Sequence, residues 1–95
     1  MGNAKSTTNH NEIRRWVSER GGQPARVKGT ERGNDPGLLR IDYPGFSGEE
    51  TLEAISWEEF FKGFDSHGLA FLYQDEPESR FSKLIDRDSA EARAA

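Results

Sequence analysis

The chain of 95 residues contains no cysteine. Disulfide bonds, thiolate metal ligands and cysteine nucleophiles are therefore excluded, and the composition fits a reducing compartment. The sequence also lacks any apolar run near the roughly 18–20 residues that a membrane-spanning helix needs. Its first nine residues hold one lysine and no apolar segment, unlike a secretory signal. We therefore expect a cytoplasmic protein that has no membrane partner.

The motifs that mark common catalytic and phosphate-binding sites are also absent. The sequence contains no G-x-x-x-x-G-K-[ST], G-x-S-x-G or H-E-x-x-H. One of the two histidines, His67, stands close to Asp65, but no nucleophile is suggested beside this pair. The run Asp86-Arg87-Asp88 lacks the loop glycine and the final glutamate of an EF-hand. The sequence thus predicts no catalytic residue, no metal site and no cofactor.

Aromatic residues, in contrast, make up 11% of the chain, which is too many for a disordered protein. All of them except Trp16 lie between Tyr43 and Phe81, so we expect the core there. A chain of this length buries only about 60–65% of the surface that it exposes when unfolded, and its stability should be modest. We expect a single domain over residues 9–87, a disordered leader over 1–8 and a disordered tail over 88–95.

Two segments have the capping residues and the apolar spacing of amphipathic helices. Asn9 and Ser56 can each accept a hydrogen bond from the backbone N–H three residues on, and a glutamate at that position can return the bond. Gly21 and Gly68 end the two segments. The apolar stripes are Ile13, Trp16, Val17 and the stem of Arg20 in the first segment, and Trp57, Phe60, Phe61 and Phe64 in the second. The second, aromatic stripe is predicted to form the centre of the core.

Four segments have the composition of β-strands. They are residues 25–28, 38–43, 69–73 and 81–85. Together with the helices they give the order α-β-β-α-β-β, in which two hairpins flank a crossover helix. This order predicts an α+β fold with one four-stranded, mainly antiparallel sheet and two helices packed on one face.

Five segments give the chain a distinctive pattern. They are His10-Asn11-Glu12-Ile13-Arg14-Arg15-Trp16, Glu19-Arg20-Gly21-Gly22-Gln23-Pro24-Ala25, Leu39-Arg40-Ile41-Asp42-Tyr43-Pro44-Gly45, Ile55-Ser56-Trp57-Glu58-Glu59-Phe60-Phe61 and Leu69 to Asp75. In this pattern residues 9–87 resemble a family of short, uncharacterised bacterial proteins. The family has no established biochemical role, so the resemblance implies a bacterial protein and supplies no site residue.

Some proteins of that family carry the name 1,4-alpha-glucan branching enzyme. Branching enzymes resemble (β/α)₈-barrel hydrolases, and such a barrel needs about 200 residues or more. Retaining glycoside chemistry also needs two carboxylates about 5–5.5 Å apart on a rigid scaffold around a sugar cleft. We therefore do not expect branching activity from this chain.

Charge is distributed unevenly along the chain, although the net charge is only −4. Residues 1–33 carry seven basic and three acidic residues, whereas residues 34–78 carry two basic and eleven acidic residues. The basic third could contact the phosphates of a nucleic acid, or it could pair with the acidic middle of the chain. The candidate nucleic-acid contacts are Arg14, Arg15, Arg26, Lys28 and Arg32.

The sequence contains clear helix and strand patterns but none of the catalytic or phosphate-binding motifs sought above. We therefore expect a non-catalytic interaction or accessory module that binds another protein, as a monomer or a homodimer. Nucleic-acid binding through the basic third is the alternative. The first six residues also match the M-G-x-x-x-[ST] pattern of N-myristoylation at Gly2. We expect a chance match, because this modification requires a eukaryotic acyltransferase.

Overall fold

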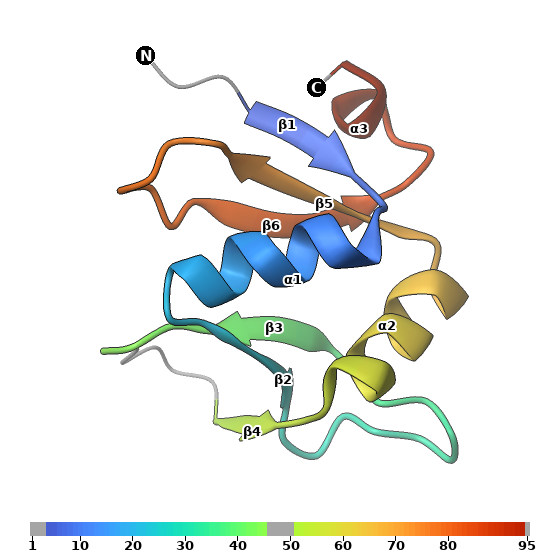
Figure 1. Cartoon of the computed structure of the whole chain (residues 1–95). Helices are drawn as coiled ribbons and strands as arrows, with labels where there is room; N and C mark the ends of the chain where they lie inside the picture. The colour runs from blue at the N-terminus through green and yellow to red at the C-terminus, as the bar shows by residue number, and fades with distance from the viewer. Residues whose placement is uncertain (1–3, 46–50, 95) are drawn as a thin grey trace.

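Residues 4–45 and 51–94, which a computed structural model describes, form six strands and three helices (Figure 1). The strands are β1 (Ala4–Thr7), β2 (Gln23–Val27), β3 (Leu39–Asp42), β4 (Leu52–Ala54), β5 (Leu69–Gln74) and β6 (Ser82–Asp86). The helices are α1 (His10–Glu19), α2 (Trp57–Ser66) and α3 (Ala90–Ala94). The acylation pattern at Gly2 lies outside the described residues.

The α+β class is confirmed, but the prediction of one four-stranded sheet is wrong. The strands form two three-stranded antiparallel sheets, with the orders β1-β5-β6 and β3-β2-β4. Two strands were not predicted: β1 lies in the segment expected to be a disordered leader, and β4 lies where no strand was expected. Among residues 4–45 and 51–94, both strands lie at the edge of a sheet and pair on one side only. Backbone hydrogen bonds hold such a strand without the alternating apolar residues by which strands are recognised.

The two long helices begin at the predicted capping residues. The side chain of Asn9 accepts a hydrogen bond from Glu12 N at 2.9 Å, and that of Ser56 accepts one from Glu59 N at 3.0 Å. The expected return bond from Glu12 is replaced, because Asn9 N–H donates instead to Thr7 Oγ1 at 3.0 Å. The carboxylate of Glu12 thereby remains available for contacts with β5.

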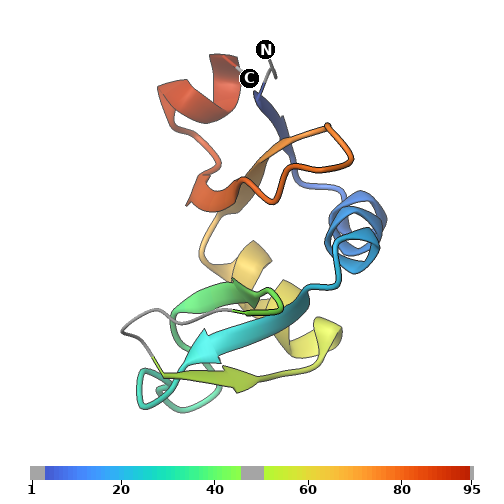
Figure 2. The ribbon, with the colours of Figure 1, turned by 90° about the vertical axis from the view of Figure 1, so that its left-hand side faces the viewer.

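The core lies between α1, α2 and both sheets. Three of the four predicted aromatic residues of α2 are buried, whereas Trp57 packs at the margin of the core. Trp16 of α1 contacts rings from both sheets: its ring centroid lies 5.5 Å from that of Phe71 in β5 and 6.5 Å from that of Tyr43, which follows β3. Figures 1 and 2 both show α1 at the level where the two sheets meet. This helix therefore joins the two sheets on one side.

A short helix follows β6, in the segment that was predicted to be a disordered tail. Ser89 Oγ accepts a hydrogen bond from Ala92 N at 3.1 Å, and Ala92 is 9% exposed. Lys83 of β6 forms an ion pair of 3.1 Å with Glu91 of α3. Alanine-rich polar segments of this kind carry little apolar signal, so the contact could not be read from the sequence.

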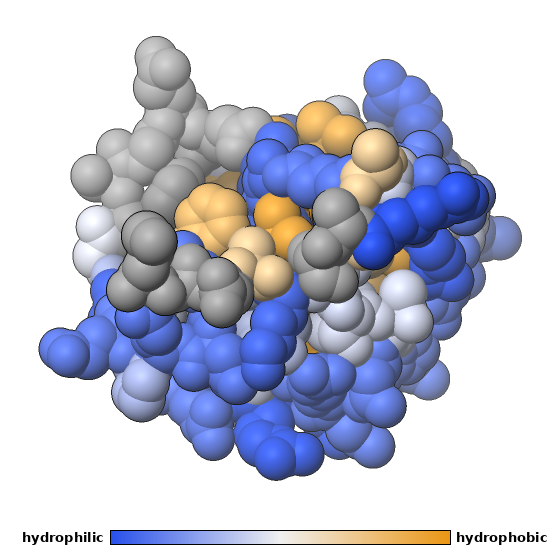
Figure 3. All heavy atoms as spheres, turned by 90° about the horizontal axis from the view of Figure 1, so that it is seen from above, coloured by the Kyte–Doolittle hydropathy of each residue, from blue (hydrophilic) through white to orange (hydrophobic). Residues whose placement is uncertain are grey.

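Viewed from the end where β1 and α3 lie, the visible surface is mostly hydrophilic, with hydrophobic side chains in small separate places (Figure 3). No helix in the described ranges is long and apolar enough to cross a membrane.

Candidate functional site

The two sheets face each other edge to edge where β3 lies beside β6. The hydroxyls of Tyr43 and Ser82 lie 2.8 Å apart at one end of this boundary. Within the described residues, no backbone hydrogen bond joins the two strands. A cavity of about 250 Å³ lies at the boundary, and we name it the β3–β6 groove. It is lined by Leu39, Arg40, Ile41, Tyr43, Phe71, Ser82, Lys83 and Leu84.

The backbone of β3 presents to this groove polar groups that bond to no second strand among the described residues. One of them, the carbonyl oxygen of Leu39, accepts a hydrogen bond from Arg40 Nη1 at 2.8 Å. Val27 N donates to Leu38 O at 2.8 Å, which makes these residues a hydrogen-bonded pair of the β2–β3 ladder. Antiparallel ladders alternate, so Arg40 is the next residue of β3 that bonds to β2. The N–H and C=O groups of Leu39 and Ile41 therefore point away from β2, toward β6.

The backbone of β6 presents matching groups from the other side. Arg87 N donates to Gly68 O at 2.8 Å just beyond the β5–β6 ladder. The same alternation makes Lys83 and Ile85 the residues of β6 that bond to β5. The backbone N–H and C=O groups of Ser82, Leu84 and Asp86 therefore point toward β3.

The groove combines an apolar floor with positive charge. Leu39 is 3% exposed and Phe71 is fully buried, while Ile41 and Leu84 pack partly buried against the same core. The two charged residues that line the groove, Arg40 and Lys83, are both cations. Such a surface suits an extended backbone that carries an apolar side chain next to a carboxylate.

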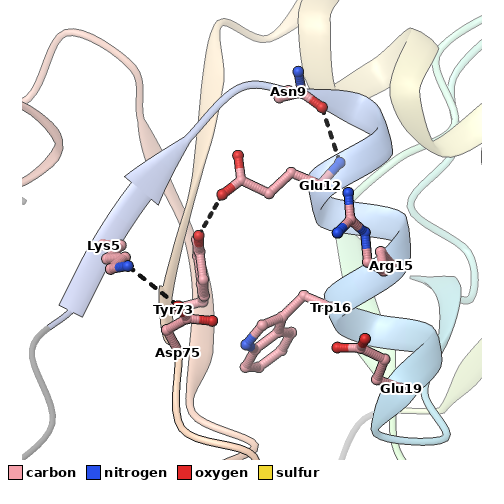
Figure 4. A pocket seen from close by; sticks show the side chains of 8 residues that line it. All are labelled: Lys5, Asn9, Glu12, Arg15, Trp16, Glu19, Tyr73 and Asp75. Atoms are coloured by element: carbon pink, nitrogen blue, oxygen red, sulfur yellow. Dashed lines mark hydrogen bonds and ion pairs between the residues drawn. The ribbon is translucent and has the colours of Figure 1, made fainter.

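A larger and more polar cavity of about 540 Å³ lies between α1 and the edge formed by β1 and β5 (Figure 4). We name it the α1–β5 pocket. It is lined by Lys5, Asn9, Glu12, Arg15, Trp16, Glu19, Tyr73 and Asp75. At its centre the carboxylate of Glu12 accepts hydrogen bonds from Thr7 Oγ1 at 2.6 Å and from Tyr73 OH at 2.5 Å.

The pKa values of Glu12 and Tyr73 in this pocket do not suit acid–base catalysis. The hydroxyls of Thr7 and Tyr73 hold the pKa of Glu12 below its ordinary value. Burial and the nearby Glu12 carboxylate raise the pKa of Tyr73 above its ordinary value. A general acid or base works best with a pKa near the operating pH. Here both pKa values move away from neutrality, so the pair stays as a carboxylate and a neutral phenol.

Arg20 is a buried cation, whereas the sequence pattern predicted only that its stem extends the apolar stripe of α1. Its guanidinium donates to the carbonyl oxygens of Ser79 at 2.6 Å, Glu76 at 2.7 Å and Trp16 at 2.9 Å. It also lies 4.0 Å from the centre of the Trp16 ring. The contacts fix the turn that leads into β6, and therefore position one side of the β3–β6 groove. The spacing of Trp16 and Arg20 by one helical turn was the available signal.

The predicted nucleic-acid contacts are divided between separate parts of the fold. Arg26 in β2 is 17% exposed and forms ion pairs with Glu53 at 2.9 Å, Glu59 at 3.2 Å and Glu31 at 3.8 Å. Arg15 lines the α1–β5 pocket beside the other sheet. The remaining three candidates are exposed: Arg14 in α1, Lys28 directly after β2, and Arg32 in the loop that follows.

The two histidines serve as contacts between elements. His10 stacks on Phe61 with a centroid separation of 4.0 Å, and its Nε2 lies 3.0 Å from Asp65. His67 Nε2 lies 2.8 Å from Asp35 in the loop between β2 and β3. Asp65 is therefore not the partner of His67 that sequence proximity suggested. No cluster of three or more potential metal ligands occurs in the described part of the chain.

No family model matches the chain, and comparisons with curated proteins and with solved structures find no match. The resemblance to short bacterial proteins stays an expectation drawn from the sequence pattern. Any functional inference therefore depends on the geometry of the groove and the pocket.

Proposed function

We propose that the chain is a non-catalytic cytoplasmic interaction module that binds an extended segment of a partner protein in the β3–β6 groove. The observation that carries this proposal is the pair of strand edges that face each other across the groove, neither of which bonds to a further strand among the described residues. An exposed strand edge is a template for pairing with another chain. Peptides that add a strand to a sheet gain affinity from backbone hydrogen bonds and specificity from side-chain pockets.

The lining of the groove favours one kind of segment. The apolar floor around Ile41 and Leu84 has room for an apolar side chain in its 250 Å³. The ammonium group of Lys83, which is half exposed beside Glu91, favours a carboxylate beside that side chain. The preferred partner is therefore an extended segment in which an apolar residue is flanked by aspartate or glutamate.

The polar parts of the molecule support a non-catalytic role. In the α1–β5 pocket, the pKa values of Glu12 and Tyr73 are both displaced from neutrality by contacts within the fold. Both histidines lie against carboxylates that come from other elements. These groups act as contacts between elements, and none of them has the arrangement of a nucleophile and its base.

The alternative, nucleic-acid binding, has less support from the geometry. Three carboxylates surround Arg26, the candidate that lies nearest the middle of its sheet. A phosphate would have to compete with these carboxylates for the same guanidinium. The exposed candidates Arg14, Arg15, Lys28 and Arg32 carry this alternative, and a salt titration described below tests it.

Peptide selection tests the proposed function. A library of random ten-residue peptides is selected on the immobilised chain, and the selected peptides are titrated into isotope-labelled protein. We expect peptides that pair an apolar residue with a carboxylate, and amide shifts centred on Ile41 and Leu84. Selection of no peptide, or shifts centred on the α1–β5 pocket, would overturn the proposal. Concentration-dependent shifts at the same residues without peptide would identify a second copy of the chain as the occupant instead.

A charge reversal at the rim provides the matched comparison. Lys83→Glu should weaken binding of an acidic peptide about tenfold, because it replaces attraction by repulsion at the groove. Lys62→Glu makes the same change in charge at an exposed position of α2 that does not line the groove, and should leave the affinity nearly unchanged. Equal losses in both variants would indicate long-range electrostatics rather than a contact in the groove.

A further inference from the structure

We propose that β3 and β6 pair with each other in one defined register and so close the β3–β6 groove. The chain then forms a single antiparallel sheet in the order β1-β5-β6-β3-β2-β4. The arrangement with two sheets is the open state of the same molecule. This inference concerns the isolated chain and does not depend on a partner.

The directions of the two strands permit antiparallel pairing. Tyr43 directly follows the last residue of β3, and Ser82 is the first residue of β6. Their hydroxyls lie 2.8 Å apart, and the arrows of the two strands in Figure 1 point in opposite directions. If Tyr43 stands opposite Ser82, counting along the strands places Ile41 opposite Leu84.

The backbone groups agree with this register. Ile41 and Leu84 are among the residues whose N–H and C=O groups point into the groove, so they can exchange two hydrogen bonds. A shift by one residue would place an outward-pointing residue opposite one that already bonds within its own sheet. Pairing also removes a cost of the open state, because Leu39 is only 3% exposed while its N–H has no backbone partner among the described residues.

The side chains agree as well. Ile41 and Leu84 both pack against the core, so the register creates an apolar cross-strand pair on that face. On the opposite face it places Asp42 opposite Lys83, a carboxylate facing an ammonium group. Lys83 now pairs with Glu91 of α3 at 3.1 Å, and both side chains are 50% exposed. Closure therefore places the carboxylate of Asp42 beside Lys83 in addition to that of Glu91. Through Lys83, the open or closed state of the groove is coupled to α3.

Closure would regulate access to the groove. In the closed sheet β3 and β6 are no longer edges, so a partner segment can bind only to the open fraction of molecules. The apparent affinity falls in proportion to that fraction. This consequence alone rests on the proposed function.

Nuclear magnetic resonance of the unmodified chain tests the register directly. In an antiparallel pair without mutual hydrogen bonds the α-carbons lie only about 4.5 Å apart. We therefore expect a nuclear Overhauser contact between the α-protons of Asp42 and Lys83. The amides of Ile41 and Leu84 should exchange with solvent at least tenfold more slowly than their intrinsic rates. Absence of the contact together with unprotected amides at both positions would overturn the proposal.

A charge variant tests the cause of the register. Asp42→Lys places like charges opposite each other and should speed exchange at Ile41 and Leu84 roughly two- to fivefold. The exchanged pair, Asp42→Lys with Lys83→Asp, should restore protection. Asp88→Lys, in the turn after β6, is the control with the same change in charge. Equal exchange in Asp42→Lys and Asp88→Lys would overturn the predicted pairing.

These experiments distinguish failure of a variant to fold from failure of the proposal, and failure of the proposal from failure of the proposed function. If Asp42→Lys does not fold, the contact and the exchange rates of the unmodified chain decide the proposal without it. If the closed register is observed but no peptide is ever selected, the proposed function is wrong and this inference stands.

Discussion

The hydroxyl of Tyr73 donates a hydrogen bond of 2.5 Å to the carboxylate of Glu12, which is 61 residues earlier in the chain. The bond joins β5 to the first turn of α1. Thr7, at the end of β1, donates to the other oxygen of the same carboxylate at 2.6 Å. One carboxylate thereby connects three elements at the edge of a sheet, and its ionisation becomes part of the stability of the fold.

The Tyr73→Phe variant should lower the stability and change its dependence on pH. The pKa of Glu12 is lower in the folded chain than in the unfolded chain, so its contribution is present above about pH 4.3 and is lost as the pH falls below that. We expect a loss of about 1 kcal/mol at pH 7, because the pair is only partly buried. The free energy of unfolding should also fall less steeply between about pH 4.3 and pH 2.

Urea unfolding at a series of pH values measures both effects. Tyr43→Phe is the control, because it removes a hydroxyl that contacts the neutral hydroxyl of Ser82. It should lower the stability without changing the acid slope. If the two variants show the same acid slope, Tyr73 does not hold the pKa of Glu12.

Phe60→Ala should destabilise the protein strongly. Phe60 is fully buried in the core, and removal of a buried phenylalanine costs about 3–5 kcal/mol. Natural domains have only about 5–15 kcal/mol of stability in total. Phe81→Ala makes the same substitution at a residue that is 44% exposed, and should cost less than about 1 kcal/mol. Thermal melting followed by tryptophan fluorescence compares them, and similar midpoints would refute the core assignment.

Arg20→Lys should destabilise the turn between β5 and β6. A lysine keeps the charge but cannot reproduce three hydrogen bonds to carbonyl oxygens together with stacking on Trp16. We expect a loss of about 1.5–3 kcal/mol, the range for a hydrogen bond to a charged group. Hydrogen exchange in residues 76–80 should become faster. Arg14→Lys, on the exposed side of α1, should change neither quantity.

The basic third of the chain should show no steep salt-dependent binding of nucleic acid. If Arg14, Arg15, Arg26, Lys28 and Arg32 all contacted phosphates of duplex DNA, the log–log slope of affinity against salt would be near −4.5, since each contact releases about 0.9 counterion. We expect no binding in a titration at about 50 mM salt, where such contacts are strongest. A steep slope that disappears in the double variant Arg26→Ala, Lys28→Ala would favour nucleic-acid binding over the proposed binding of a protein segment.

The helices and the core could be predicted because their signals are local. Asn9 and Ser56 lie within three residues of the amides that they cap, and Phe60 and Phe64 fall on one face by helical spacing alone. The strand β1 could not be predicted in this way. Its stability comes from pairing with β5, which places Lys5 opposite Tyr73. That neighbour is far away in the sequence.

The candidate site was less accessible to sequence reasoning than the fold. The groove exists because Ile41 and Leu84 lie on facing edges of different sheets, and strand order cannot be deduced from one sequence. Charge counting correctly noted a basic and an acidic region, but it could not place Arg26 among three carboxylates. Only the tertiary arrangement distinguishes a cation that is held within the fold from one that is exposed.

The two sheets differ in how much of the chain each one needs. The sheet β3-β2-β4 is made entirely from residues 23–54, whereas β1 pairs Ala4 with Gln74. Closing a long loop costs more entropy than closing a short one, so the local sheet should form early and β1 should join last. Pulsed hydrogen exchange during refolding should protect Ala25 before Tyr73. During synthesis on the ribosome, β1 must therefore stay unpaired until β5 has been made.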